Sequence, residues 1–323
     1  MQARTILARK LVNLALTLLA VWTLNFFLFH MLPGDPTYAL VPARLPEAAR
    51  EEMRLVFGLD QPLLDQYFIS LKSALSGDFG TSWFNRNEPV LDVVVEKMKN
   101  TLLLVGVGTF LSVYIGVRLG VIAGSRRGEA SDVVIVGTSL AFYAMPAFWL
   151  AMILLMILAV RFDLFPLHGF KTIGAEYDSL LDEIADRLWH LVLPVATFVL
   201  ITLSEFVLMM RNALIDVLTE DFINTARAKG VSPNVIIRKH AVPNALLPTI
   251  ATTAMFVGWI VTGAIMIEVV FSWPGVGELT WQALDKRDFP VLQGIFLFVT
   301  VAMLLANFVA DIVYTYIDPR VKI

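Results

Sequence analysis

The sequence predicts an all-α membrane protein with six transmembrane helices and both termini in the cytoplasm. Of its 323 residues, 57% are hydrophobic and only 16% are charged, and the mean hydropathy is +0.72. A soluble domain of this size carries about a quarter charged residues, so the missing charge indicates a lipid environment. Apolar runs also recur at the length of about 20 residues that a helix needs to cross a bilayer.

Six apolar runs define the predicted spans. They cover residues 11–32, 101–123, 133–160, 188–210, 245–271 and 289–314. The first follows three basic residues, as a signal peptide would, but a cleavable apolar segment has only about 7–15 residues, so we interpret it as a span. Pro146 and Pro194 lie inside the third and fourth runs. Membrane helices tolerate such prolines where neighbouring groups satisfy the freed carbonyls.

The distribution of Lys and Arg predicts the orientation. Residues 1–10, 124–132, 211–244 and 315–323 hold 12 Lys/Arg and 6 Asp/Glu, whereas the alternate loops 33–100, 161–187 and 272–288 hold 12 and 19. The loops denser in positive charge face the cytoplasm. The chain then divides into an N-terminus with the first span (1–32), an extracytoplasmic helical segment (33–100) and a five-span core (101–323) with a cytoplasmic loop at 211–244.

The extracytoplasmic segment predicts two short helices, over 46–57 and 62–76, because each begins near a proline and stops before a glycine. An apolar stripe follows the second helix. We expect these helices to lie on the membrane or to cap the outer mouth. In the second span, Gly116, Gly120 and Gly124 form overlapping GxxxG steps, which predict close approach of another helix.

Three acidic residues, Glu205, Glu268 and Asp311, fall within predicted spans. Intramembrane acids are costly and are candidates for function. Glu268 and Asp311 lie near span ends, so we favour structural or interfacial roles over an ion relay. The chain has no cysteine, and its four histidines match no metal-ligand spacing, so no metal site is predicted.

The segment 221–248, "DFINTARAKGVSPNVIIRKHAVPNALLP", predicts a cytoplasmic helix, a tight turn and a second helix. Gly230 suits the left-handed position just past a helix end. Ser232 can act as an N-cap, and Pro233 suits the first helical position. Small residues (Ala226, Ala228, Gly230) would allow a partner to approach closely, and the basic residues Arg227, Lys229, Arg238 and Lys239 surround them. Positive charge flanking a span explains the basic residues but not the ordered turn.

This segment resembles the "EAA" loop of ATP-binding-cassette importer permeases, in which EAA, three residues, Gly, nine residues and I-x-L-P follow one another. Ala226, Gly230 and Pro243 match that pattern, whereas Asn224, Thr225, His240 and Val242 replace its Glu, first Ala, Ile and Leu. Other segments resemble the first-subunit type of dipeptide, oligopeptide and nickel permeases: "HMLPGDP" (30–36), "GLDQPLLDQY" (58–67), "GDFGTSW" (77–83), "NALLP" (244–248), "VFSWPGVGEL" (270–279) and "DPR" (318–320).

The resemblance implies a non-catalytic transmembrane subunit in the cell membrane of a prokaryote. It would form the pathway with a second, related permease, and an external solute-binding protein would deliver the cargo. Two cytoplasmic ATPase subunits would bind ATP and Mg, so this chain itself would need no cofactor. The loop would be the coupling helix that docks on an ATPase. Peptides are the leading cargo, and oligosaccharides or nickel chelates are the alternatives.

One independent observation agrees with this interpretation. The chain has no GxxxxGK[ST] phosphate-binding loop, so ATP-driven work would have to come from a partner. A self-contained secondary transporter is a remote alternative, because such proteins show internal repeats and broken helices with midplane ionisable sites. A membrane-embedded enzyme would need a clustered nucleophile and base or a metal site, which the sequence does not suggest.

Overall fold

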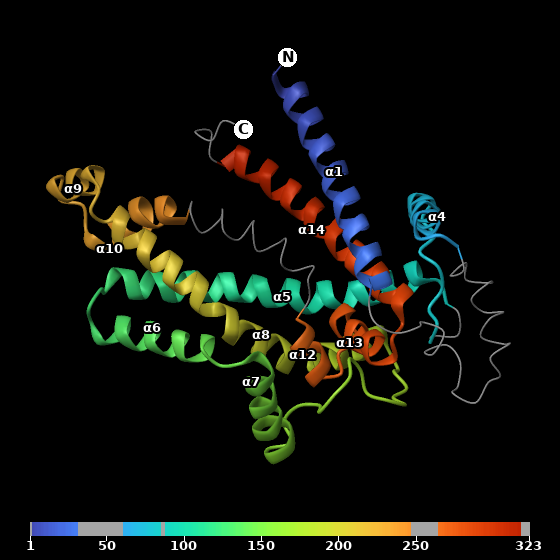
Figure 1. Cartoon of the computed structure of the whole chain (residues 1–323). Coiled ribbons are helices and arrows are strands. Elements are labelled where there is room, and N and C mark those ends of the chain that lie inside the picture. Colours follow the sequence, from blue (N-terminus) through green and yellow to red (C-terminus); the bar gives the residue numbers. More distant parts are fainter. Residues whose placement is uncertain (1, 32–60, 85–87, 247–263, 318–323) are drawn as a thin grey trace. The chain divides into compact units, whose positions relative to one another are not determined.

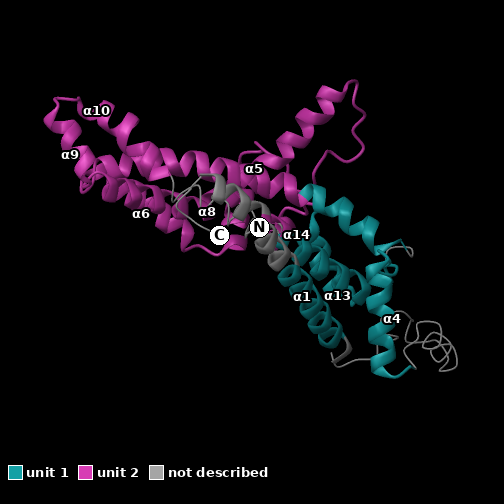
Figure 2. Ribbon diagram, turned by 90° about the horizontal axis from the view of Figure 1, so that it is seen from above, with its two compact units in different colours: residues 1–100, 275–304 teal, residues 101–274, 305–323 magenta. Residues whose placement is uncertain are grey.

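The computed structural model describes residues 2–31, 61–84, 88–246 and 264–317, and these residues are helical apart from their loops (Figure 1). No strand forms within these ranges, although one isolated antiparallel bridge joins Thr81 to Pro89. The chain divides into two compact units, residues 1–100 with 275–304 and residues 101–274 with 305–323 (Figure 2). The helices α5 and α14 each contribute to both units.

The helices follow one another along the chain, and two of them are short π-helices. In order, they are α1 (Gln2–Met31), α4 (Leu63–Leu75), α5 (Val90–Ser125), α6 (Ala130–Tyr143), α7 (Ala147–Leu154), the π-helix η1 (Leu155–Arg161), α8 (Leu180–Val217), α9 (Asp221–Ala228), α10 (Pro233–Val235), the π-helix η2 (Ile236–Ala241), α12 (Ile265–Val270), α13 (Val276–Lys286) and α14 (Phe289–Ile317).

Four of the described helices, α1, α5, α8 and α14, are long and apolar enough to cross a membrane, and a bent pair of helices could be a fifth span. These five coincide with five of the six predicted runs. The predicted span at 245–271 lies mostly outside the described residues, as does the predicted helix at 46–57. The predicted helix at 62–76 corresponds to α4.

The third predicted span is not one straight helix. It breaks at Pro146 into α6 and a second segment, Ala147–Arg161, which comprises α7 and η1 and is bent by 102° from α6. Met145 precedes the proline and is therefore biased away from helical geometry. The carbonyl of Pro146 accepts hydrogen bonds from the backbone N–H groups of Trp149 and Leu150, so α7 starts anew at the proline. The sequence predicted a single span that tolerates Pro146, whereas the structure bends sharply at this residue.

Two helices extend well beyond the spans predicted from hydropathy. The predicted span at 101–123 lies within α5, which has 36 residues, and the span at 188–210 lies within α8, which has 38. At 1.5 Å per residue each is more than about 50 Å long, compared with about 30 Å of hydrocarbon. Each helix is therefore longer than the hydrocarbon of a bilayer is thick, and the last turns of α8 lead directly to α9.

The glycines of α5 allow α8 to approach closely, as the GxxxG steps predict. A Cβ on Gly116 would lie 2.6 Å from Phe206 Cβ, and one on Gly120 would lie 2.7 Å from the Val207 carbonyl oxygen. Elsewhere along the same two helices, a hydrophobic core of the second unit joins α5, α7, η1, α8, α12 and the residues just after α12. Its buried members are Leu104, Val105, Ala151, Ala159, Leu191, Leu193, Val195, Val199, Ile267, Phe271 and Trp273.

The first unit has its own core, which joins the end of α1 to the first turns of α5, to α13 and to α14. Its buried members are Phe29, Val90, Val93, Val94, Val276, Leu279, Ala283, Val291, Leu292 and Ile295. In the same unit, a buried carboxylate joins the residues just before α14 to the segment at 82–84. Asp288 accepts hydrogen bonds from the Ser82 hydroxyl (2.5 Å) and from the backbone N–H groups of Trp83 and Phe84 (3.2 Å each).

Candidate functional site

The loop that follows α8 folds as a helix, a turn and a second helix. The first helix, α9, begins one short turn after the end of α8, with Glu220 at its N-cap position. It ends at Ala228, and Gly230 follows with a φ of +77°. In Figure 1 this pair of helices lies at one end of the group formed by α5, α6 and α8.

The turn after α9 is a Schellman motif. The backbone N–H of Gly230 donates to the Arg227 carbonyl at 2.9 Å, and that of Val231 donates to the Ala226 carbonyl at 3.2 Å. These two bonds satisfy carbonyls that a helix end otherwise leaves unpaired, and they require a left-handed residue at position 230. Because glycine adopts this conformation without strain, the sequence determines the sharp turn at this residue.

The second helix begins at the proline that the sequence singled out. Pro233 occupies the first position of α10, and Ser232 is its N-cap residue, whose carbonyl accepts from the N–H groups of Val235 and Ile236 at 3.0 Å. No side-chain capping bond from Ser232 forms. The helix then widens into η2 just before Pro243. A wider turn relieves the clash that a proline ring makes with the preceding turn of an α-helix.

A small hydrophobic core fixes this loop to the end of α8. Its buried residues come from α8, α9, η2 and the turn of helix after η2: Met210, Leu214, Ile223, Ala226, Ile236, Ala241 and Ala245. Val117 and Val121 of α5 pack against the same core. Ala226 matches the second Ala of the resembled motif. It is only 8% exposed and therefore packs in the core of the loop. The loop is thus firmly packed on α8 and α5.

The remaining candidate residues of the loop are exposed on its outer surface. They are Asn224, Thr225, Arg227, Ala228, Lys229, Gly230, Ser232, Pro233, His240 and Pro243. Their polar side chains are oriented locally: the Thr225 hydroxyl donates to the Asp221 carbonyl at 3.0 Å, and the Arg227 guanidinium donates to Asn224 Oδ1 at 3.2 Å. A Cβ on Gly230 would meet no atom within 4 Å, so the outer face is open at the turn.

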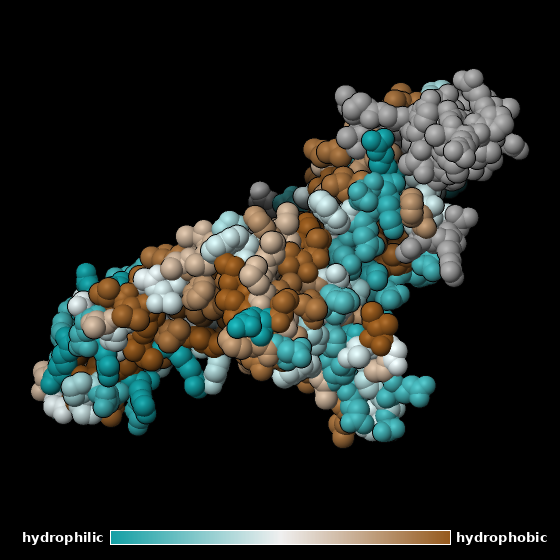
Figure 3. All heavy atoms as spheres, turned by 90° about the horizontal axis from the view of Figure 1, so that it is seen from below, coloured by the Kyte–Doolittle hydropathy of each residue, from teal (hydrophilic) through white to brown (hydrophobic). Residues whose placement is uncertain are grey.

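Phe222 is a residue of this surface that the sequence reasoning missed. Its ring lies on α9 and is 43% exposed, whereas the neighbouring Ile223 is fully buried. Because adjacent residues on a helix point in different directions, the sequence could have indicated that only one of these two residues belongs to the core. An exposed aromatic ring beside basic and small residues is typical of an interface anchor. The space-filling view shows hydrophilic residues gathered at this end of the second unit and hydrophobic residues along its middle (Figure 3).

An ion pair holds the helices beneath the loop together. Arg211 of α8 donates through Nε and a terminal nitrogen to the two carboxylate oxygens of Asp132 on α6, at 2.6 and 2.8 Å. The N–H of Gly128 donates to the same carboxylate at 2.9 Å. Asp132 is only 3% exposed. This bidentate arrangement fixes the turn between α5 and α6 to the part of α8 that carries the loop.

The three acidic candidates do not form one site with the loop. Glu205 is half-buried on α8. Glu268 of α12 is fully buried and accepts a hydrogen bond from the Thr101 hydroxyl at 2.8 Å. Asp311 belongs to α14, and its side chain lies outside the described residues. Within the described ranges, no three His, Asp or Glu side chains are arranged to hold a metal ion.

Comparison with known proteins identifies the family to which this arrangement belongs. Residues 116–323 match the family model described as binding-protein-dependent transport system inner membrane component. Residues 3–105 match the model of the N-terminal part of such membrane components. The chain belongs to this family. It is therefore an inner-membrane permease component of a binding-protein-dependent transport system, with several apolar helices.

Relatives of this permease component align along nearly the whole chain. It is 34% identical to the oligopeptide transport system permease protein AppB of Bacillus subtilis over 320 residues, 99% of each chain. It is also 34% identical to the dipeptide transport system permease protein DppB of Escherichia coli (95% of each) and to the di/tripeptide transport system permease protein DppB of Pseudomonas aeruginosa (98% of each). The resemblance expected from the sequence is confirmed.

A solved structure supports the fold. The chain is similar to the MetNI methionine ABC transporter in an inward-facing conformation, with a TM-score of 0.56 and 19% identity. This similarity covers 72% of the present chain and 99% of the other. The helical architecture of the permease component is therefore shared with a structure of an ABC transporter.

Proposed function

We propose that this chain is the permease subunit of an ATP-driven peptide importer and that its 221–243 loop is the contact through which ATPase subunits drive it. In this proposal the permease has six spans with both termini in the cytoplasm, and residues 33–100 lie outside. It forms the translocation pathway with a second, related permease. Two cytoplasmic ATPases bind and hydrolyse ATP with Mg, and a solute-binding protein delivers the cargo.

The observation that carries the coupling role is the construction of the loop. Its inner side is a packed core continuous with α8 and α5, so that a force applied to α9 is transmitted to membrane helices. Its outer side offers an aromatic ring, small residues and positive charge to a partner. A loop that only connected two spans would not require both a packed inner core and an exposed outer surface of this composition.

The names of the relatives support peptides as the cargo. All three are permeases of oligopeptide, dipeptide or di/tripeptide transport systems, and they align over at least 95% of the chain. Oligosaccharides and nickel chelates remain the alternatives that the sequence resemblance allows. Cargo is tested by uptake of radiolabelled peptides into cells that carry the permease with its neighbouring transport genes, in competition with unlabelled peptides, oligosaccharides and nickel chelates.

The coupling role is tested by a pair of matched glycine substitutions. Gly230 and Gly174 both have positive φ (+77° and +75°), and a Cβ at either would meet no atom within 4 Å. Valine at either position brings similar local backbone strain of about 1–2 kcal/mol, too little to unfold the helical bundle. We expect the Gly230→Val permease to accumulate in the membrane normally but to transport at least about tenfold less, since about 1.4 kcal/mol of lost docking already corresponds to that factor.

Gly174→Val provides the control for strain, because it lies in the connection between η1 and α8, outside the proposed docking surface. It should transport nearly as well as the unmodified permease. Normal transport by Gly230→Val, or equal losses in the two variants at equal membrane abundance, would contradict the coupling role of the loop.

A further inference from the structure

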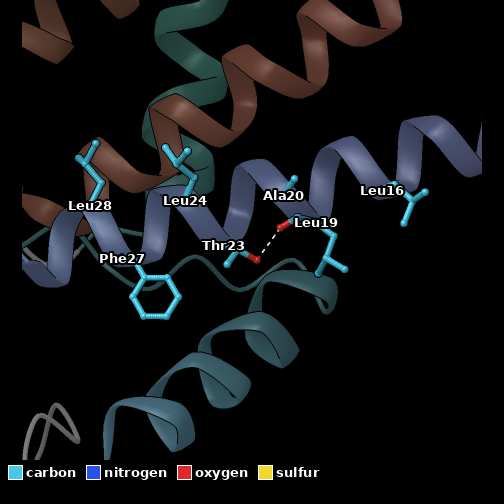
Figure 4. Close-up of a pocket in the computed structure, with 7 residues that line it drawn as sticks. All are labelled: Leu16, Leu19, Ala20, Thr23, Leu24, Phe27 and Leu28. Carbon is cyan, nitrogen blue, oxygen red and sulfur yellow. Dashed lines mark hydrogen bonds between the residues drawn. The ribbon is translucent and has the colours of Figure 1, made fainter.

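An apolar groove of about 720 Å³ runs along α1 (Figure 4). It is lined by Leu16, Leu19, Ala20, Thr23, Leu24, Phe27 and Leu28. These residues fall within the most apolar part of the helix, Val12–Phe29, which is the candidate membrane span. The groove therefore belongs to a surface that lies in the membrane.

The groove exposes almost no hydrogen-bonding capacity. Its one polar side chain, Thr23, is already paired, because the hydroxyl donates to the Leu19 carbonyl at 2.7 Å and lies 2.8 Å from the Tyr67 hydroxyl. In hydrocarbon each unpaired polar group costs several kcal/mol, so internal pairing of this kind is what a lipid-facing surface requires. A docking surface for a protein in water normally keeps polar groups available at its rim.

The short helix α4 rests on this part of α1. The ring of Tyr67 packs edge-on against Phe26 at 5.3 Å between centroids and stacks on Phe27 at 6.3 Å. Thr23, which pairs with Tyr67, lies six residues inside the Phe29 end of the apolar window, about 9 Å along the helix at 1.5 Å per residue. The contact between α4 and α1 therefore lies within the depth of about 5–10 Å to which an interfacial helix buries its apolar face.

The rest of α4 carries a second apolar surface that nothing in the described structure covers. Leu64, Phe68, Leu71 and Leu75 are spaced i, i+4, i+7 and i+11 and therefore form one stripe. Three of them are strongly exposed: Leu64 at 66%, Phe68 at 62% and Leu75 at 82%. Asp65 and Lys72 lie on another side of the same helix, so α4 is amphipathic.

We propose that α4 is embedded in the membrane–water boundary beside α1 and that lipid acyl chains contact its leucine–phenylalanine stripe and fill the groove on α1. Amphipathic helices of this kind lie in the membrane plane with their apolar face about 5–10 Å below the headgroups. The stripe continues the lipid-facing surface of a membrane span, and its polar neighbours Asp65 and Lys72 face the headgroups or water. This role is separate from the coupling loop and holds for either orientation of the chain.

The test uses nitroxide labels on single cysteines, which the cysteine-free chain makes straightforward. Labels replace Leu64, Phe68 or Leu75 on the stripe and, as matched controls on the same helix, Asp65 or Lys72. The full chain is assembled with its transporter partners in vesicles of phosphatidylethanolamine with phosphatidylglycerol as the minor lipid. Collision rates are measured with oxygen, which concentrates in hydrocarbon, and with a water-soluble nickel chelate.

We expect the stripe labels to collide several-fold more with oxygen than with the chelate, and the control labels to show the reverse ratio. Chelate access to the stripe equal to that of the controls would overturn the proposal by showing a helix in water. Stripe labels that neither reagent reaches would also overturn it, because a partner protein would then cover the stripe. Three stripe positions keep the test decisive if one variant fails to assemble.

Discussion

At the scale of single residues, glycines decide how closely α5 and α8 approach. Gly116 and Gly120 lie where any side chain would collide with α8, whereas a Cβ on Gly106 of the same helix would meet no atom within 4 Å. A glycine inside a helix lowers the stability of the helix by about 1 kcal/mol relative to alanine. Its presence at positions 116 and 120 is therefore explained by packing, but at position 106 nothing in the described structure explains it.

Alanine should affect the thermal stability of the permease differently at Gly120 and at Gly106. Gly120→Ala would place a methyl group 2.7 Å from the Val207 carbonyl oxygen. Pushing the helices apart costs about 1–3 kcal/mol, so we expect a lower midpoint of thermal unfolding and less protein in the membrane. Gly106→Ala is the control and should leave the midpoint unchanged or raise it. The prediction fails if both variants unfold at the same temperature as the unmodified permease.

At the scale of elements, the ion pair between Asp132 and Arg211 fixes α6 to the last turns of α8, from which the loop continues. Arg211→Gln would leave a buried carboxylate without its cation, and breaking a buried pair costs up to about 3–5 kcal/mol. We expect a large drop in the unfolding midpoint of the purified permease. Replacing both residues by leucine removes both charges and should recover most of that loss. A double variant as unstable as Arg211→Gln would show that the pair is not the relevant contact.

The elements also show what the sequence could and could not predict. Apolar runs located the helices α1, α5, α8 and α14, because length and hydropathy suffice to identify a span. They did not reveal the full lengths, because the first turns of α5 contain charged residues yet also carry Val90, Val93 and Val94, which pack in a core. The bend at Pro146 was missed because a proline in an apolar run is compatible with both a tolerated kink and a break.

The candidate site was predictable only where local sequence determines it. Gly230 and Pro233 could be assigned to the turn and the helix start because their backbone chemistry restricts them to such positions. Contacts between distant residues left no local trace: Asp132 and Arg211 are 79 positions apart, and Glu268 and Thr101 are 167 apart. The exposure of Phe222 depends on which side of α9 packs on α8, which also requires the structure.

At the scale of the whole molecule, the proposed orientation places the loop that contains Glu176 outside the cell and Ser232 inside. Both residues are exposed. Single cysteines at these positions in otherwise cysteine-free permease should react differently with a membrane-impermeant thiol reagent. In intact spheroplasts position 176 should be labelled, and position 232 should be labelled only after lysis. Labelling of position 232 alone in intact spheroplasts would invert the proposed topology.

The proposed function depends above all on contact between the outer face of α9 and an ATPase subunit, which cross-linking can detect. Ala228 on α9 and Ala130 at the start of α6 are both exposed alanines, and the proposed topology places both on the cytoplasmic side. Each is replaced by cysteine in the assembled transporter, which is then treated with a short thiol–amine cross-linker. We predict that Ala228→Cys forms a product with the ATPase subunit and that Ala130→Cys does not. No product from Ala228→Cys, or equal products from the two variants, would contradict the coupling contact.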